Sequence, residues 1–156
     1  MTTSLTWQVR PATATDHEFL VDLAQRLTIG VAPWRDPAAV LATMREFLLH
    51  DLEEMGPDST VFIATAPDDT PVGAATIGRG KSFTGEAHAY LGELAVVAEV
   101  EGQGAATALL AAVEEWAREQ CLGLVVLDTG AANSHARRFY SRYGYAEETV
   151  RLAKVL

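Results

Sequence analysis

The sequence predicts an α/β (α+β) fold in which one mixed sheet is flanked by helices on both faces. Three observations lead to this prediction. Short apolar or alternating runs that suit strands recur along the chain, segments with apolar residues at helical spacing lie between them, and glycine or proline separates most of these segments. In chain order the elements are strand, helix, helix, three strands, helix, strand, helix and strand, an order typical of layered α/β proteins.

The first three elements are one strand and two helices. Residues 7–10 alternate between apolar and polar side chains as a short strand does. Residues 16–28 carry apolar side chains on one helical face, with an aspartate at the start that can cap the helix. Asp36 and Pro37 form a strong start for the helix over residues 36–55, because proline suits the first helical position.

The middle of the chain contains three strands and a long helix. Residues 61–64 and 72–77 suit an antiparallel hairpin with an Asp68-Asp69 turn. Residues 87–97 are long enough for a central strand. The segment 104–120 then places alanine, leucine and valine side chains at helical spacing, which predicts a helix that packs on the sheet.

The last three elements are a buried strand, a helix and a second alternating segment. Residues 124–127 form an unbroken apolar run, which is typical of a strand buried on both faces. Asn133 can cap a helix that Gly144 closes, over residues 133–143. Residues 145–155 alternate like a strand, so we expect a final strand at this position.

Length and charge limit the function. A chain of 156 residues is expected to form one domain with a full core. Twelve basic against 21 acidic residues give a net charge of -9, which argues against nucleic acid and anionic membranes as partners and favours cationic ligands. The histidines and the single cysteine have no metal-ligand spacing. No targeting or membrane-spanning segment is visible, so we expect a cytoplasmic protein.

The glycines at positions 102 and 104 stand where a strand meets a helix. The first N–H groups of a helix have no partner inside it and point outward with the positive end of the dipole, so such a turn can bind phosphate. A plain tight turn is one alternative. A dinucleotide-binding fingerprint that includes Asp128 is another, although Thr107 occupies its third glycine position and too little chain follows for a full doubly wound sheet.

A longer pattern surrounds this turn. It comprises Leu94-Ala95-Val96, residues 101–106, Leu109-Leu110, Asn133, Ala136, Phe139-Tyr140 and Tyr143-Gly144-Tyr145. The pattern resembles the GNAT superfamily of acyl-CoA-dependent N-acyltransferases. The resemblance implies that residues 1–156 are a single N-acetyltransferase domain. It also implies a mostly antiparallel sheet of about six to seven strands, with a central, splayed parallel strand pair.

The activity that the resemblance implies is transfer of an acetyl group from acetyl-CoA to a primary amine of a small molecule, or to an exposed amino group. The transfer is expected to occur directly in a ternary complex. This suits a chain that offers no convincing nucleophile for a covalent intermediate. The alternative is a noncatalytic acyl-CoA-binding module of the same fold.

The resemblance places the cofactor along the central strand, the glycine turn and the last helix. The cofactor-binding residues that it implies are Leu94, Ala95, Val96, Gly102, Gln103, Gly104, Ala105, Ala106, Asn133, Ala136 and Phe139. A backbone N–H near Ala95 or Val96 would hold the oxyanion. Glu101 departs from the family pattern, which has glutamine or arginine there, so its carboxylate is expected to turn away from the pyrophosphate or to weaken its binding.

Three residues are candidates for proton transfer. Tyr140 matches the family tyrosine that protonates the leaving thiolate, although by itself it would be interpreted as a core aromatic residue. Glu93 is the first candidate for the base that deprotonates the amine, and Asp128 is the second. A strand residue that faces solvent or a dimer partner, and an aspartate that caps a turn, are the respective alternatives.

Trp34 and Arg35 stand where the family places its acceptor-binding wall, between the first two helices. Packing of the loop is the alternative for both residues. Relatives often pair through strands near the C-terminus, so a homodimer is also expected.

Overall fold

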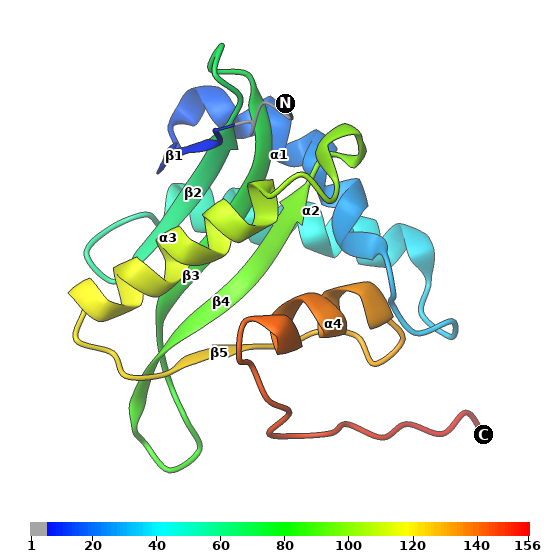
Figure 1. Cartoon of the computed structure of the whole chain (residues 1–156). Coiled ribbons are helices and arrows are strands. Elements are labelled where there is room, and N and C mark those ends of the chain that lie inside the picture. The colour runs from blue at the N-terminus through cyan, green and yellow to red at the C-terminus, as the bar shows by residue number, and fades with distance from the viewer. Residues whose placement is uncertain (1–5) are drawn as a thin grey trace.

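The computed structural model describes residues 6–156 as one sheet with helices on both faces (Figure 1). The strands are β1 (Gln8–Pro11), β2 (Ser59–Thr65), β3 (Pro71–Lys81), β4 (Ala87–Val96) and β5 (Val125–Leu127). The α-helices are α1 (His17–Leu23), α2 (Pro37–Glu53), α3 (Ala105–Glu119) and α4 (Ser134–Arg142). Short 3-10 helices lie at η1 (Ala14–Asp16), η2 (Ala24–Thr28) and η3 (Ala98–Val100).

The strands lie in the order β1-β2-β3-β4-β5, and all neighbours are antiparallel except the parallel pair of β4 and β5. This confirms the mixed, mostly antiparallel sheet. The ladder between β4 and β5 ends at Leu91 and Leu127, whereas β4 continues to Val96. The two strands therefore part at their carboxyl ends, where a ligand can enter between them.

Two apolar clusters fix the helices on opposite faces of the sheet. Figure 1 shows α3 and α4 on one face and α1 and α2 on the other. The buried residues of the first cluster include Ala75, Leu91, Leu109, Leu110 and Val113. Those of the second include Leu20, Leu23, Leu48, Val61 and Ile63. α1, α2 and α3 thus pack the apolar stripes that the sequence shows against the sheet, whereas α4 contributes the partly buried Phe139 and Tyr140.

The helices begin largely where the sequence predicts. The Asp36 carboxylate accepts a hydrogen bond from the N–H of Ala39 at 3.0 Å, and Pro37 occupies the first turn. The helix expected over residues 16–28 is divided instead, because the α-helical part ends at Leu23 and the chain tightens into η2. Arg26 lies in η2 and contacts the end of β4.

The expected final strand over residues 145–155 is wrong, because that segment forms no strand in the structure. Its side chains are exposed apart from Tyr145, and the described residues form five strands rather than six to seven. Alternation alone does not form a strand when no neighbouring strand supplies hydrogen bonds. In the part of the chain that the structure describes, no helix is long and apolar enough to span a bilayer.

Candidate functional site

The glycine turn between β4 and α3 presents free backbone donors. Gly102 and Gly104 have φ angles of +75° and +95°, which glycine adopts without the steric cost that a side chain brings. Gly104 is the N-cap of α3. Within residues 6–156 no acceptor pairs with the N–H groups of Gly104, Ala105 or Ala106. These groups can therefore receive an anion.

Gln103 braces the turn. Its N–H donates to the Val100 carbonyl at 3.1 Å, and its side-chain amide donates to the Glu99 carbonyl at 3.0 Å. Its own carbonyl accepts from the Trp7 indole N–H at 2.7 Å. The N–H of Gln103 is thus occupied inside the turn, whereas those of the three following residues are free.

A groove of about 240 Å³ lies between this turn and α4. Its lining residues are Val96, Val100, Glu101, Gly102, Gly104, Ala105, Ala106, Thr107, His135, Arg138, Phe139 and Arg142. One wall therefore carries backbone N–H groups and the other carries two guanidinium groups. Asn133 caps α4, with Oδ1 accepting from the N–H of Ala136 at 3.1 Å, which confirms its N-cap role.

Val96 ends β4 beside the groove. The N–H of Val97 donates to the Val72 carbonyl of the β3 side at 2.8 Å. Because successive residues of a strand point their backbone groups to opposite sides, the N–H and carbonyl of Val96 point away from β3, where β5 has already ended. Arg26 Nε donates to that carbonyl at 3.0 Å. Of Ala95 and Val96, the second therefore has the N–H that faces the opening between the strands.

Glu93 lies at an irregularity in β4. Ala75 pairs with Leu94 and Ile77 pairs with Leu91, so Gly92 and Glu93 together face Thr76. The N–H of Glu93 donates to Thr76 Oγ1 at 3.1 Å. A Cβ at Gly92 would lie 2.7 Å from the same oxygen, so glycine is required at this close approach.

The environment of Glu93 changes its acidity. Burial, and then the negative charge of Asp51 on α2, raise the pKa of Glu93 to about 7. Burial also raises the pKa of Asp51, and a hydrogen bond from Thr76 partly opposes this rise. Two carboxyl groups thus lie near each other on the face that α2 covers. Near neutral pH, Glu93 can both accept and release a proton.

Tyr140 lies on α4 among aromatic neighbours. Its ring centroid is 5.2 Å from that of Phe139 and 5.5 Å from that of Tyr145. Burial, and then the charge of Glu93, raise the pKa of Tyr140 above that of a free phenol. The structure therefore brings Tyr140 within electrostatic reach of Glu93.

Asp128 is exposed just after β5 and accepts a hydrogen bond at 2.9 Å from the hydroxyl of Tyr90 on β4. Burial, and then Asp128, raise the pKa of Tyr90 to about 12, and the charge of Glu93 adds to the effect. Tyr90 thus contacts Asp128 directly and senses the charge of Glu93. No sequence pattern indicates a role for Tyr90 or Asp51.

Trp34 and Arg35 lie in the connection between η2 and α2, and the Trp34 side chain is 52% exposed. The start of this connection contacts α4, because the side-chain amide of Asn133 donates to the Ile29 carbonyl at 3.4 Å. The loop is thus tied to the last helix near its capping residue. Within residues 6–156, no hydrogen bond or ion pair joins Trp34 or Arg35 to Glu93.

Glu101 is held by a partner that sequence analysis missed. Arg26 Nη2 lies 2.5 Å from Glu101 Oε2, and His135 Nε2 lies 3.8 Å from Oε1. The carboxylate therefore still lines the groove, but a guanidinium group from η2 neutralises it. Nothing in the local sequence around either residue indicates this pair.

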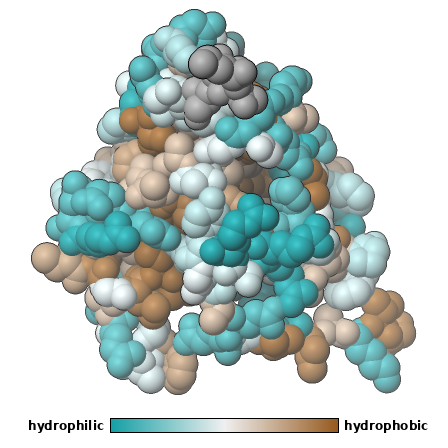
Figure 2. All heavy atoms as spheres, in the orientation of Figure 1, coloured by the Kyte–Doolittle hydropathy of each residue, from teal (hydrophilic) through white to brown (hydrophobic). Residues whose placement is uncertain are grey.

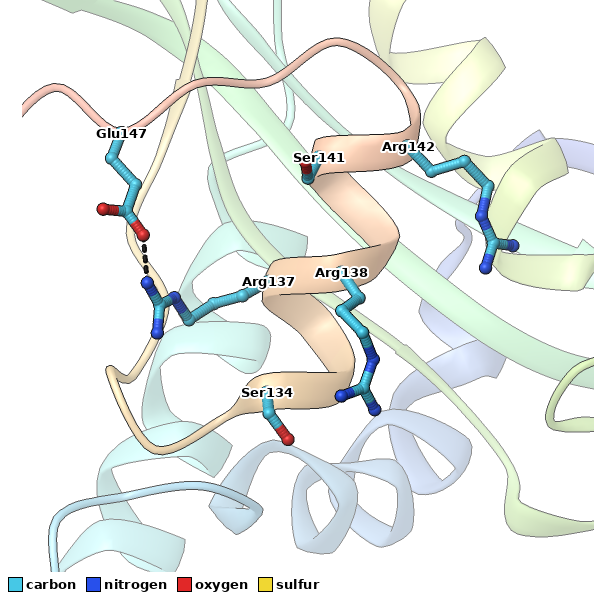
Figure 3. Close-up of a pocket in the computed structure, with 6 residues that line it drawn as sticks. All are labelled: Ser134, Arg137, Arg138, Ser141, Arg142 and Glu147. Atoms are coloured by element: carbon cyan, nitrogen blue, oxygen red, sulfur yellow. Dashed lines mark hydrogen bonds and ion pairs between the residues drawn. The ribbon is translucent and has the colours of Figure 1, made fainter.

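The outer face of α4 is basic. Figure 2 shows hydrophilic side chains over this helix, and Figure 3 shows Arg137, Arg138 and Arg142 projecting from it with Ser134 and Ser141. Arg137 forms an ion pair with Glu147 of the tail, whereas Arg138 and Arg142 also line the groove described above. In residues 6–156 no group of three or more His, Cys, Asp or Glu side chains could hold a metal ion.

Comparison with known proteins identifies relatives of this chain. A model of the "Acetyltransferase (GNAT) family" matches residues 19–145. An aminoglycoside N(6')-acetyltransferase type 1 of Serratia marcescens is 29% identical over 136 residues, which are 85% of this chain and 88% of the relative.

Solved structures share the fold. A provisionally named acetyl transferase from Pyrococcus furiosus has a TM-score of 0.77 at 21% identity, over 97% of this chain and 100% of that chain. The aminoglycoside N-acetyltransferase AAC(6')-Iy in complex with a bisubstrate analogue, CoA-S-monomethyl-acetylneamine, has a TM-score of 0.70 at 22% identity, over 97% and 99% of the two chains.

Proposed function

The chain belongs to the acetyltransferase (GNAT) family, and on that premise we propose that residues 1–156 form one domain that acetylates a primary amine with acetyl-CoA. The observation that carries the proposal is the groove between the glycine turn and α4. Glu93 and Tyr140 lie within electrostatic reach of each other.

The residues of the groove fit a diphosphate. Free N–H groups of Gly104, Ala105 and Ala106 offer hydrogen bonds, and the dipole of α3 favours negative charge at this end. Arg138 and Arg142 add two positive charges from the opposite wall. When bound, acetyl-CoA supplies a thioester carbonyl that an amine can attack.

Glu93 is the proposed base. An alkylammonium group of pKa ~10.4 must lose a proton before it can attack, which costs roughly 4–5 kcal/mol at pH 7. A carboxylate whose pKa is raised to about 7 is a better proton acceptor than an ordinary one and is still largely ionised above pH 7. Asp128 is the second candidate, because its carboxylate is exposed at the end of β5 and oriented by Tyr90.

Tyr140 is the proposed acid. A phenol of ordinary pKa ~10 is protonated at neutral pH, so the hydroxyl can give a proton to the departing thiolate. The N–H of Val96 points into the gap between β4 and β5, where it can stabilise the oxyanion that forms on the carbonyl. Base, acid and oxyanion donor then come from β4 and α4.

The acceptor is proposed to be a small amine with more than one positive charge. Glu93, Asp51 and Asp128 bring negative charge to the acceptor side, and the chain as a whole carries a net charge of -9. The names of the Serratia relative and of the bisubstrate complex make aminoglycoside amines the first compounds to try.

The test is a panel of amines incubated with acetyl-CoA and followed by free-thiol detection. We expect thiol release with aminoglycosides or polyamines, and less with neutral amines and lysine peptides. Calorimetry with CoA completes the test. Binding of CoA without turnover on any amine would instead support the noncatalytic acyl-CoA-binding module.

We also propose that the protein forms a homodimer through its C-terminal segment. Val150 and Leu152 are 73% and 89% exposed, and β5 pairs only with β4 among the described residues. A second copy could cover the apolar side chains and supply a neighbour for the open strand edge. Light scattering should give twice the chain mass, and the mass should halve after deletion of residues 148–156. A monomeric intact chain would reject this proposal.

A further inference from the structure

The groove proposed to hold the diphosphate contains an acidic residue. Glu101 lines it together with the glycines of the turn, and its side chain is 44% exposed. An unpaired carboxylate at this position would repel a diphosphate bound to the N–H groups of Ala105 and Ala106. The groove therefore needs a means of compensating this charge.

Arg26 meets that requirement from a different part of the fold. Its Nη2 lies 2.5 Å from Glu101 Oε2, while its Nε donates to the Val96 carbonyl at 3.0 Å. Two contacts on one planar guanidinium fix its orientation better than a single contact would. The side chain is 27% exposed and lies outside the lining of the groove, behind Glu101.

The other charged groups that face Glu101 do not replace Arg26. His135 Nε2 is 3.8 Å from the second carboxylate oxygen, which is beyond hydrogen-bond distance. Arg138 and Arg142 line the opposite wall, and no ion pair with Glu101 involves either of them among the described residues. The two α4 arginines are thus left for the ligand.

We propose that Arg26 is a positioning residue for the cofactor, which neutralises Glu101 and holds it against the end of β4 so that the glycine turn can accept a diphosphate. This inference rests on the proposed function, because it presumes that CoA binds in this groove. A half-exposed ion pair contributes little to folding stability. The ion pair is therefore expected to affect ligand affinity instead. Without Arg26, the charge of Glu101 would repel the doubly charged diphosphate.

The test measures the Kd of CoA by calorimetry for four proteins: wild type, Arg26→Gln, Glu101→Gln and the double variant. Glutamine at position 26 keeps an N–H donor that can reach the Val96 carbonyl but removes the charge. We expect Arg26→Gln to bind CoA about 5- to 30-fold more weakly. Glu101→Gln should bind as well as wild type or better, and the double variant should return to within about threefold of wild type.

Rescue in the double variant distinguishes charge compensation from a purely structural role. If Arg26 only packed η2 against β4, removal of the Glu101 charge would not restore affinity. Arg79→Gln is the matched control, because it breaks an ion pair of 3.3 Å with Asp58 outside the groove, and it should leave the Kd unchanged. Thermal melting of Arg26→Gln, Glu101→Gln and the double variant checks that these proteins remain folded.

Each outcome decides between the two claims. Unchanged affinity in Arg26→Gln, or a loss that Glu101→Gln does not rescue, overturns the role of Arg26 while CoA binding by wild type still supports the proposed function. Absence of CoA binding by wild type overturns the proposed function, and the role of Arg26 falls with it.

Discussion

The two halves of the candidate site are built in different ways. The proposed cofactor half consists of backbone N–H groups at the start of α3, which one contiguous turn supplies. The proposed acceptor half consists of the side chains of Asp51, Tyr90, Glu93 and Asp128, which come from α2, β4 and the end of β5. The backbone donors persist beside an unusual side chain such as Glu101, whose charge Arg26 neutralises, whereas a site made of side chains changes with each substitution.

The largest effect on turnover is expected when a single side-chain hydroxyl group is removed. Tyr140→Phe should lower kcat by about 10²- to 10⁴-fold, because it removes the proposed acid, and it should leave the Kd of CoA unchanged. The measurement is turnover by thiol release, combined with calorimetry on the same protein.

Tyr145→Phe is the matched control for that variant. The Tyr145 hydroxyl donates to the Glu114 carboxylate on α3 at 3.1 Å, so its loss should lower stability by about 1 kcal/mol and leave kcat intact. Full turnover by Tyr140→Phe would remove the assignment of the acid.

The second largest effect is expected at the base. A carboxyl group whose pKa is raised to about 7 loses its basic form as the pH falls, so kcat/KM of wild type should rise with pH and level off above about 7. Glu93→Gln should lower the plateau by about 10- to 100-fold and flatten the rise. Glu119→Gln, at the exposed end of α3, should reproduce the wild-type profile. An unchanged rise in Glu93→Gln would point to Asp128 instead.

The same contrast explains what the sequence could predict. The glycine turn, α3, α4 and the cap at Asn133 follow from local patterns, and the structure confirms these elements. Arg26 and Glu101 are 75 positions apart, and Tyr90 and Asp128 are 38 apart, so no local pattern reveals either contact. The prediction for residues 145–155 was wrong for the opposite reason. Their local alternation predicts a strand, but no neighbouring strand pairs with them.

A smaller effect, on the affinity for CoA, is expected in the cofactor half. Gly104→Ala places a side chain at a φ of +95°, although the space around its Cβ is open to 3.8 Å. The cost is therefore in the backbone, about 1–2 kcal/mol, and it should distort the N–H groups enough to weaken CoA binding roughly tenfold. Gly123→Ala is the control, since its Cβ meets nothing within 4 Å and its φ is not positive. Equal affinities in the two variants would argue against the turn as the diphosphate site.

The smallest effect concerns Asp51, and it tests how the acceptor half sets its own acidity. Burial is the larger cause of the raised pKa of Glu93, and the charge of Asp51 is the smaller one. Asp51→Asn removes only the smaller cause, so the rising limb of kcat/KM should move to lower pH by less than about one unit, with a plateau close to that of wild type. Glu53→Gln, two residues further along α2 and exposed, should not move the limb. Two interacting carboxyl groups titrate as a pair. If the rising limb of kcat/KM stays in place, Asp51 and Glu93 are not coupled, and burial at the irregularity of β4 alone raises the pKa of Glu93.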